Sequence, residues 1–179
     1  MKKNLLVAQS GGPTAVINAS LSGVIKEALE REEIGKVYGA KYGVEGVFRE
    51  DFINLRDTVL EQKRSIFPVE SMDIANLSPL AREICQEERE TEISPDFMQS
   101  LAFFSRLATT PASALGSCRR KLHNPEEDPS DFDTILHVFK KWNIGYFLYI
   151  GGNDSMDTAW KLSLYFQNKG EDIRVIGVP

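Results

Sequence analysis

The chain has 179 residues, which is typical of one domain, with 21 basic and 26 acidic residues and a formal net charge of −5. This charge excludes nucleic-acid binding through a broad basic face. With 42% hydrophobic and 26% charged residues, the chain can bury a core. It has two cysteines, Cys85 and Cys118, and no apolar run of the ~20 residues that a membrane span requires. These features predict a cytoplasmic protein without membrane or nucleic-acid partners.

The first third of the chain predicts a strand–helix–strand unit. Leu5–Ala8 is a short continuous apolar run, typical of a strand covered on both faces. Apolar residues at helical spacing predict a helix over Ala15–Glu32, and residues 36–42 predict a second strand. The YGVEG sequence that follows, with Gly43 and Gly46, predicts a turn.

The middle of the chain predicts a helical insertion at about residues 56–110. Helical patterns cover residues 71–88 and 94–108, and the second helix begins with the serine, proline and aspartate typical of a helix N-terminus. A stretch of small residues, 111–118, then interrupts the helical pattern and leads into two arginines.

The last third predicts a second α/β unit. A helix runs from about Ser130 to Trp142, and residues 144–150 form a buried strand. After a glycine turn, a helix over residues 156–168 closes at Gly170, and residues 173–178 form another strand. Two strand–turn–helix units predict an α/β fold: a doubly wound parallel sheet with helices on both faces, a Rossmann-like three-layer arrangement.

Both predicted strand-to-helix turns contain a pair of glycines, Gly11-Gly12 and Gly151-Gly152. In an open parallel sheet, ligands bind beyond the carboxyl ends of the strands, where these turns lie. Glycine lets the backbone approach a ligand, and the helix that follows adds free N–H groups and a partial positive charge. Two such loops favour a phosphate compound, although either pair alone can simply make a tight turn.

The common phosphate-binding and hydrolase motifs are absent from the sequence. It contains no GxxxxGK[ST], no GxGxxG and no GxSxG. His123 and His137 are isolated from other ligand-type residues and are not predicted to bind a metal.

Four sequence segments together resemble the phosphofructokinase family, most closely its pyrophosphate-dependent members. They are QSGGPTAVINAS, YGVEG, LGSCR and IGGNDSMDTA, which occur in this order between Gln9 and Ala159. The resemblance implies an Mg²⁺-dependent phosphotransferase that phosphorylates the 1-hydroxyl of fructose 6-phosphate to give fructose 1,6-bisphosphate. Its substrates would be pyrophosphate and fructose 6-phosphate.

The resemblance also implies which residues bind the diphosphate. Arg119 corresponds to the arginine near the transferred phosphoryl group, where its charge would stabilise the reaction, and Arg120 is a possible second contact. The implied diphosphate site combines the two glycine loops, the arginines and a serine: Gly11, Gly12, Arg119, Arg120, Gly151, Gly152 and Ser155.

Asp154 and Asn153 are the positions that distinguish this chain within the resemblance. Members that use ATP resemble GGDGS at this turn, whereas this chain has Asp154 as the fourth residue. A carboxylate there would repel the α-phosphate of ATP, and it would also suit the positive end of the helix dipole. Asn153 stands where most members have an aspartate associated with Mg²⁺, so its role as a metal ligand is open.

The motifs suggest that the chain corresponds to roughly the first half of a family member. The sequence ends at Pro179, before the segment that carries the family's general base and fructose 6-phosphate residues. We therefore expect a partial donor-binding domain over residues 1–179 with little kinase activity by itself, from a parent that forms a dimer or tetramer. Two alternatives are an ATP-dependent phosphofructokinase and a non-catalytic phosphate-binding or dimerisation module.

Overall fold

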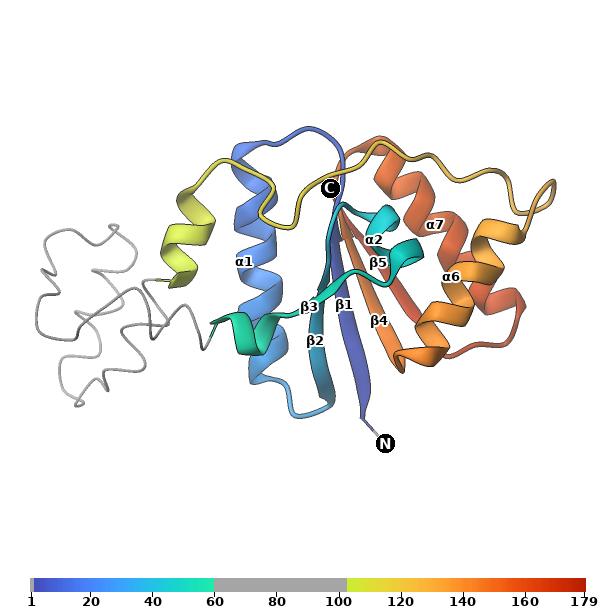
Figure 1. The fold of residues 1–179 in the computed structure, drawn as a ribbon, viewed down its shortest axis with the longest axis horizontal. Coiled ribbons are helices and arrows are strands. Elements are labelled where there is room, and N and C mark those ends of the chain that lie inside the picture. Colours follow the sequence, from blue (N-terminus) through green and yellow to red (C-terminus); the bar gives the residue numbers. More distant parts are fainter. Residues whose placement is uncertain (1, 60–102) are drawn as a thin grey trace, which may run out of the picture.

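The structure is a computed structural model that describes residues 2–59 and 103–179. It is an α/β fold in which helices cover both faces of a five-stranded sheet (Figure 1). In chain order the strands are β1 (Lys3–Gln9), β2 (Ile34–Ala40), β3 (Phe52–Asn54), β4 (Ile144–Ile150) and β5 (Arg174–Val178). The main helices are α1 (Ala15–Glu30), α2 (Val44–Arg49), α6 (Ser130–Lys141) and α7 (Asn153–Asn168). The predicted fold class is confirmed.

The strand order β3-β2-β1-β4-β5 makes β1 the central strand. It pairs in parallel with β2 on one side and β4 on the other, and β4 pairs in parallel with β5. Leu6, Val7 and Ala8 are fully buried, as the continuous apolar run in this strand predicts for a sheet covered on both faces.

The segment after β2 differs from the prediction. Instead of a simple turn it contains the short helix α2, which begins after Gly43 (φ 64°) and ends at Glu50 in the left-handed conformation (φ 54°). The chain then returns along β2 as β3, which is antiparallel. A parallel pairing needs a crossover of a dozen or more residues, and the connection from Ala40 to Phe52 is too short for one.

Two apolar clusters hold the layers together. On one face of the sheet, α1 packs Ile17, Leu21 and Ile25 against buried residues of β1 and β2. On the other face, residues of α6 and α7, including Phe139 and Phe166, pack against β1 and β4. Figure 1 shows α1 on one side of the sheet and α2, α6 and α7 on the other.

Most of the predicted insertion lies outside the described residues. This includes the whole predicted helix at 71–88 and the first part of that at 94–108. Residues 103–109 are helical, and Phe104 and Leu107 are partly buried against the α1 face of the sheet. None of the helices within residues 2–59 and 103–179 combines the length and the apolar character needed to cross a bilayer.

Candidate functional site

The candidate site lies at the carboxyl ends of β1 and β4, where the connection after β1 runs to one side of the sheet and the connection after β4 runs to the other. The chain leaves β1 through α1 to reach β2 on one side, whereas β4 lies on the other side of β1. Open α/β sheets bind ligands in the crevice at such a switch point, beyond the carboxyl ends of the strands. In Figure 1, α1 and α7 both begin at this upper edge of the sheet, so two helix N-termini adjoin it.

The two glycine loops are next to each other at this edge. A Cβ built on Gly11 would lie 3.8 Å from the backbone nitrogen of Gly152. The Ser10 N–H donates to the Ile150 carbonyl (2.9 Å), which joins the two strands immediately before the loops. Gly11 has a φ of 82°, a conformation that few residues other than glycine adopt. Residues 140 positions apart in the sequence therefore form one continuous backbone surface.

One glycine of each pair belongs to the scaffold beneath this surface. The Gly11 N–H donates to the Cys118 carbonyl (3.4 Å), and the Gly151 N–H donates to the Val178 carbonyl (3.0 Å). Gly151 is buried, and a Cβ there would lie 2.7 Å from the Ser10 carbonyl oxygen. These two glycines let the loops pack closely, and their N–H groups are already used.

The other glycine of each pair faces open space. Gly12 and Gly152 are exposed, and a Cβ on either would meet nothing within 4 Å. Within the described part of the chain their N–H groups make no hydrogen bond. The helices that follow have no side-chain cap, and the first turn of α1 has no acidic residue. Unpaired N–H groups at two helix N-termini are suited to an anion.

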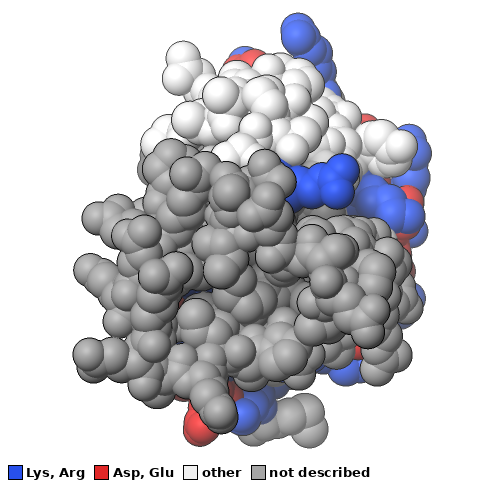
Figure 2. Space-filling model, turned by 90° about the vertical axis from the view of Figure 1, so that its left-hand side faces the viewer, with Lys and Arg blue, Asp and Glu red and all other residues white. Residues whose placement is uncertain are grey.

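Lysine and arginine side chains are visible beside this edge among the described residues (Figure 2). Figure 2 shows the side of the molecule on which α1 lies. Its upper part, towards the carboxyl edge of the sheet, is mainly uncharged, with lysine and arginine side chains beside it.

The segment that carries the two arginines lies against the first glycine loop. The Ser10 hydroxyl donates to the Cys118 carbonyl (3.2 Å), and the Ser117 hydroxyl donates to the Gly11 carbonyl. Arg119 follows directly and is exposed, and among the described residues its side chain has no hydrogen-bond or ion-pair partner. The residues immediately before Arg119 thus contact the first glycine loop, and a role for Arg119 at the site stays a prediction.

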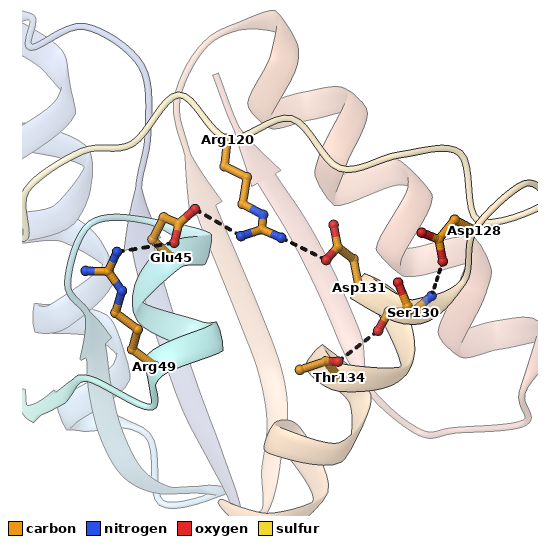
Figure 3. A network of polar contacts seen from close by, with 7 residues as sticks. All are labelled: Glu45, Arg49, Arg120, Asp128, Ser130, Asp131 and Thr134. Atoms are coloured by element: carbon orange, nitrogen blue, oxygen red, sulfur yellow. Dashed lines mark hydrogen bonds and ion pairs between the residues drawn. The ribbon is translucent and has the colours of Figure 1, made fainter.

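Arg120 is held in a polar network with residues of α2 and α6 (Figure 3). Its Nη1 donates to Glu45 (3.1 Å), its Nη2 donates to Asp131 (2.9 Å), and its guanidinium lies 4.1 Å from the centre of the Phe48 ring. Partial burial lowers the pKa of Arg120, but its hydrogen bond to Glu45 and the charge of Asp131 raise the pKa overall. Contact between Arg120 and a diphosphate stays a prediction.

The residues at the start of α7 differ in exposure. Asn153 is exposed, and the Asp154 side chain is 82% exposed with its carboxylate 3.6 Å from the Lys121 ammonium. Ser155 is 3% exposed and lies directly beneath Gly151. Asp154 therefore lies on the open surface, whereas contact between Ser155 and a ligand stays a prediction.

Three further residues help to build the site and were not predicted from the sequence. Lys121 pairs with Asp154, and its position next to Arg119 and Arg120 was a signal that could have been used. Gln9 and Asn18 are buried polar residues that accept hydrogen bonds from the backbone of the segment that ends at Arg119, which we call the arginine segment (residues 110–119). Nothing in their spacing predicted this, because their partners lie about a hundred positions away.

No group of three or more histidine, cysteine, aspartate or glutamate side chains that could hold a metal ion occurs within the described residues. The protein groups that adjoin the loops are backbone amides, one arginine and the Lys121–Asp154 pair. Together with the switch-point geometry, they are suited to an anion, and the fold is of the doubly wound α/β class.

Comparison with known proteins identifies the family. Residues 4–179 match the sequence profile of the family described as phosphofructokinase, and the chain belongs to this family. It is 38% identical over 176 residues to a pyrophosphate–fructose 6-phosphate 1-phosphotransferase of Xanthomonas campestris, covering 98% of this chain and 32% of that protein. A similar enzyme from Methylococcus capsulatus is 33% identical over 178 residues, covering 99% of this chain and 33% of that protein.

A solved structure has the same fold. The pyrophosphate-dependent phosphofructokinase of Nitrosospira multiformis has a TM-score of 0.66 and 33% identity, covering 99% of this chain and 33% of that one. The chain thus spans about a third of the length of its relatives, less than the half that the motifs suggested.

Proposed function

We propose that this chain supplies the diphosphate-binding part of a pyrophosphate–fructose 6-phosphate 1-phosphotransferase. The reaction transfers a phosphoryl group from diphosphate to the 1-hydroxyl of fructose 6-phosphate, giving fructose 1,6-bisphosphate and orthophosphate. The proposal is supported by the relatives that carry this name. The observation that carries it is the position of Gly11, whose Cβ site lies 3.8 Å from the nitrogen of Gly152.

In this proposal the open amides and Arg119 have different roles. The N–H groups of Gly12 and Gly152 and the N-termini of α1 and α7 hold the diphosphate, because they offer donors and positive potential at one edge. Arg119 offsets the negative charge on the oxygens of the transferred phosphoryl group. Catalysis of phosphoryl transfer consists largely of such positioning and charge stabilisation.

Asp154 would select diphosphate over ATP. Two unit charges ~4 Å apart repel by about 1 kcal/mol in water and about 4 kcal/mol at an effective dielectric of about 20. Because the Asp154 side chain is 82% exposed and pairs with Lys121, the lower figure applies. This corresponds to a preference of about tenfold or less against the additional phosphate of ATP.

Mg²⁺ would enter this site with the diphosphate. Mg²⁺ in proteins is usually held by one or two carboxylates together with substrate phosphates. Asp154 offers one exposed carboxylate and Asn153 an exposed amide oxygen beside it, which fits a metal carried by the phosphates. When bound, Mg²⁺ would neutralise part of the charge that Arg119 also offsets.

The proposal includes a cytoplasmic location and a homo-oligomeric parent protein. The location is supported by the use of only two cysteines, and the oligomer by the family resemblance. Cell fractionation and light scattering on the purified protein test the two points.

Calorimetric titration of the chain with Mg–diphosphate tests the proposed function. We expect saturable 1:1 binding, weaker binding of Mg–ATP, and a higher melting temperature in the presence of Mg–diphosphate. At a ligand concentration of ~100 times the Kd, binding adds about 2.7 kcal/mol to the free energy of unfolding. No heat and no shift in melting temperature would contradict the proposal and favour a purely structural role for the glycine turns.

A further inference from the structure

Two buried primary amides meet where β1 ends and α1 begins. Gln9 is fully buried and Asn18 is 1% exposed. The Gln9 Nε2 donates to the Asn18 Oδ1 (3.1 Å) and to the Ile17 carbonyl (3.2 Å). Buried amides of this kind require partners for all their donors and acceptors, because an unpaired polar group is costly away from water.

The remaining polar groups of the pair all bind one segment, residues 110–116. Gln9 Oε1 accepts from the Leu115 N–H (2.8 Å) and the Ser113 hydroxyl (3.1 Å). Asn18 Oδ1 accepts from the Ala114 N–H (2.9 Å), and its Nδ2 donates to the Thr110 carbonyl (2.9 Å). Residues 110–116 form no regular helix or strand. The two side chains therefore supply the hydrogen-bond partners that secondary structure would otherwise give to the backbone of this segment.

The same segment leads directly to Arg119. Leu115 is 4% exposed, and its carbonyl accepts from the Tyr42 N–H (2.8 Å). Three residues later the Cys118 carbonyl accepts from the Ser10 hydroxyl and the Gly11 N–H. The path of the chain between these anchors is therefore fixed close to the first glycine loop.

We propose that the Gln9–Asn18 amide pair is a positioning element for Arg119. It holds the arginine segment against the first glycine loop before any ligand binds, so that the guanidinium does not have to be ordered at the moment of binding. An apolar side chain at either position would leave the Leu115 or Ala114 N–H without its partner. The functional meaning of this role depends on the proposed function, in which Arg119 contacts diphosphate.

Asn4 is a matched control at the opposite end of β1. Its Nδ2 donates to the Trp142 carbonyl (2.7 Å), and its Oδ1 accepts from the Lys36 N–H (2.8 Å). It thus makes the same kind of cross-link with the same side chain, but far from the glycine loops, because β1 separates the two positions. Loss of either asparagine removes hydrogen bonds to the backbone of neighbouring segments.

The test compares Asn18→Ala with Asn4→Ala in a Cys85→Ser background, where Cys118 is the only remaining thiol. Three quantities are measured: the melting temperature, the Kd for Mg–diphosphate, and the rate at which a soluble disulfide reagent modifies Cys118. Cys118 is partly buried, with its sulfur 3.9 Å from the Tyr149 hydroxyl, so its reaction rate reports release of the segment. Ser113→Ala removes one hydroxyl and serves as a milder second variant if Asn18→Ala does not fold.

We expect both asparagine variants to lower the melting temperature. Asn18→Ala should also weaken Mg–diphosphate binding by about tenfold, which corresponds to about 1.4 kcal/mol. It should speed modification of Cys118 by a similar factor, whereas Asn4→Ala should leave both quantities nearly unchanged. Ser113→Ala should shift both in the same direction by a smaller factor.

Equal effects of Asn18→Ala and Asn4→Ala on Cys118 modification would overturn the positioning role. So would unchanged diphosphate binding in Asn18→Ala when the unmodified chain binds well. If the unmodified chain binds no Mg–diphosphate, the proposed function fails instead. The thiol rates then still decide whether the amide pair holds the arginine segment.

Discussion

Arg119 and Arg120 are adjacent in the sequence, yet only Arg120 has ion-pair partners among the described residues. Arg120 bridges Glu45 of α2 and Asp131 of α6 at 3.1 and 2.9 Å, whereas the Arg119 side chain is exposed. One arginine therefore joins three segments of the fold, and the other keeps its charge available to a ligand.

Replacing the two arginines should separate binding from stability. We expect Arg119→Met to weaken Mg–diphosphate binding by about tenfold or more, since hydrogen bonds to charged groups contribute about 1.5–3 kcal/mol. Its melting temperature should stay close to that of the unmodified chain. Arg120→Met should lower the melting temperature, because Glu45 and Asp131 lose their shared partner. Calorimetric titration measures the affinity, and thermal denaturation measures the melting temperature. A destabilised Arg119→Met variant with normal affinity would contradict the proposed role of Arg119 in binding.

Alanine at the two glycines of the second loop should affect the stability of the fold differently. A Cβ on Gly151 would lie 2.7 Å from the Ser10 carbonyl oxygen, whereas one on Gly152 would meet nothing within 4 Å. We expect Gly151→Ala to reduce the free energy of unfolding by about 1–3 kcal/mol, as overpacked sites do. Gly152→Ala is the matched control and should unfold at nearly the same denaturant concentration as the unmodified chain. Similar midpoints for the two variants would show that the loops are not packed as described.

Asp154 should affect the choice of phosphoryl donor. We expect Asp154→Asn to strengthen Mg–ATP binding by up to about tenfold with little change in folding, because removal of an exposed charge removes about 1 kcal/mol of repulsion. Asp157→Asn is the control: Asp157 lies on the same helix and pairs with Lys161 (2.8 Å), as Asp154 pairs with Lys121. If both variants change ATP affinity equally, general surface charge rather than position 154 is responsible.

The stability of the fold should decrease in acid through Glu50. The hydrogen bond from Lys141, followed by that from the Trp142 indole, lowers the pKa of Glu50 below its ordinary value of 4.5. A carboxyl group whose pKa is lowered in the folded state stabilises the fold above about pH 4.5, and this contribution disappears as the pH falls through the folded pKa. Glu50→Gln should therefore have a lower melting temperature at pH 7, and the difference should narrow towards pH 3. If the difference in melting temperature stayed constant from pH 7 to pH 3, the titration of Glu50 would not contribute to the acid sensitivity of the fold.

Much of the fold follows from local patterns in the sequence. The apolar runs of β1 and β4 and the helical spacing in α1 and α6 predicted these elements within a few residues of their observed bounds. Their prediction succeeds because a strand buried on both faces and a helix with one apolar stripe each have a period that local sequence records. The short antiparallel strand β3 and the helix α2 were not predicted because they are brief and depend on positive φ angles at Gly43 and Glu50.

The candidate site was predictable in its parts but not in its assembly. The glycine pairs were predicted to suit a phosphate from turn chemistry, whereas the role of Arg119 was implied by the family resemblance. However, the sequence could not separate Arg120, which Glu45 and Asp131 hold, from Arg119, or buried Ser155 from exposed Asp154. The first distinction depends on Glu45, 75 positions away in the chain, and the second on how the loop packs over the start of α7.

By itself, the sequence determined that two glycine turns end buried strands and that a segment with two arginines lies between them, because turn chemistry and hydrophobic periodicity are local properties. Only the tertiary structure decided that Gly11 and Gly152 lie side by side and that Gln9 and Asn18 hold the segment that leads to Arg119. The physical reason is that strand pairing and buried hydrogen bonds join residues about a hundred positions apart, and no local pattern encodes which residues will meet.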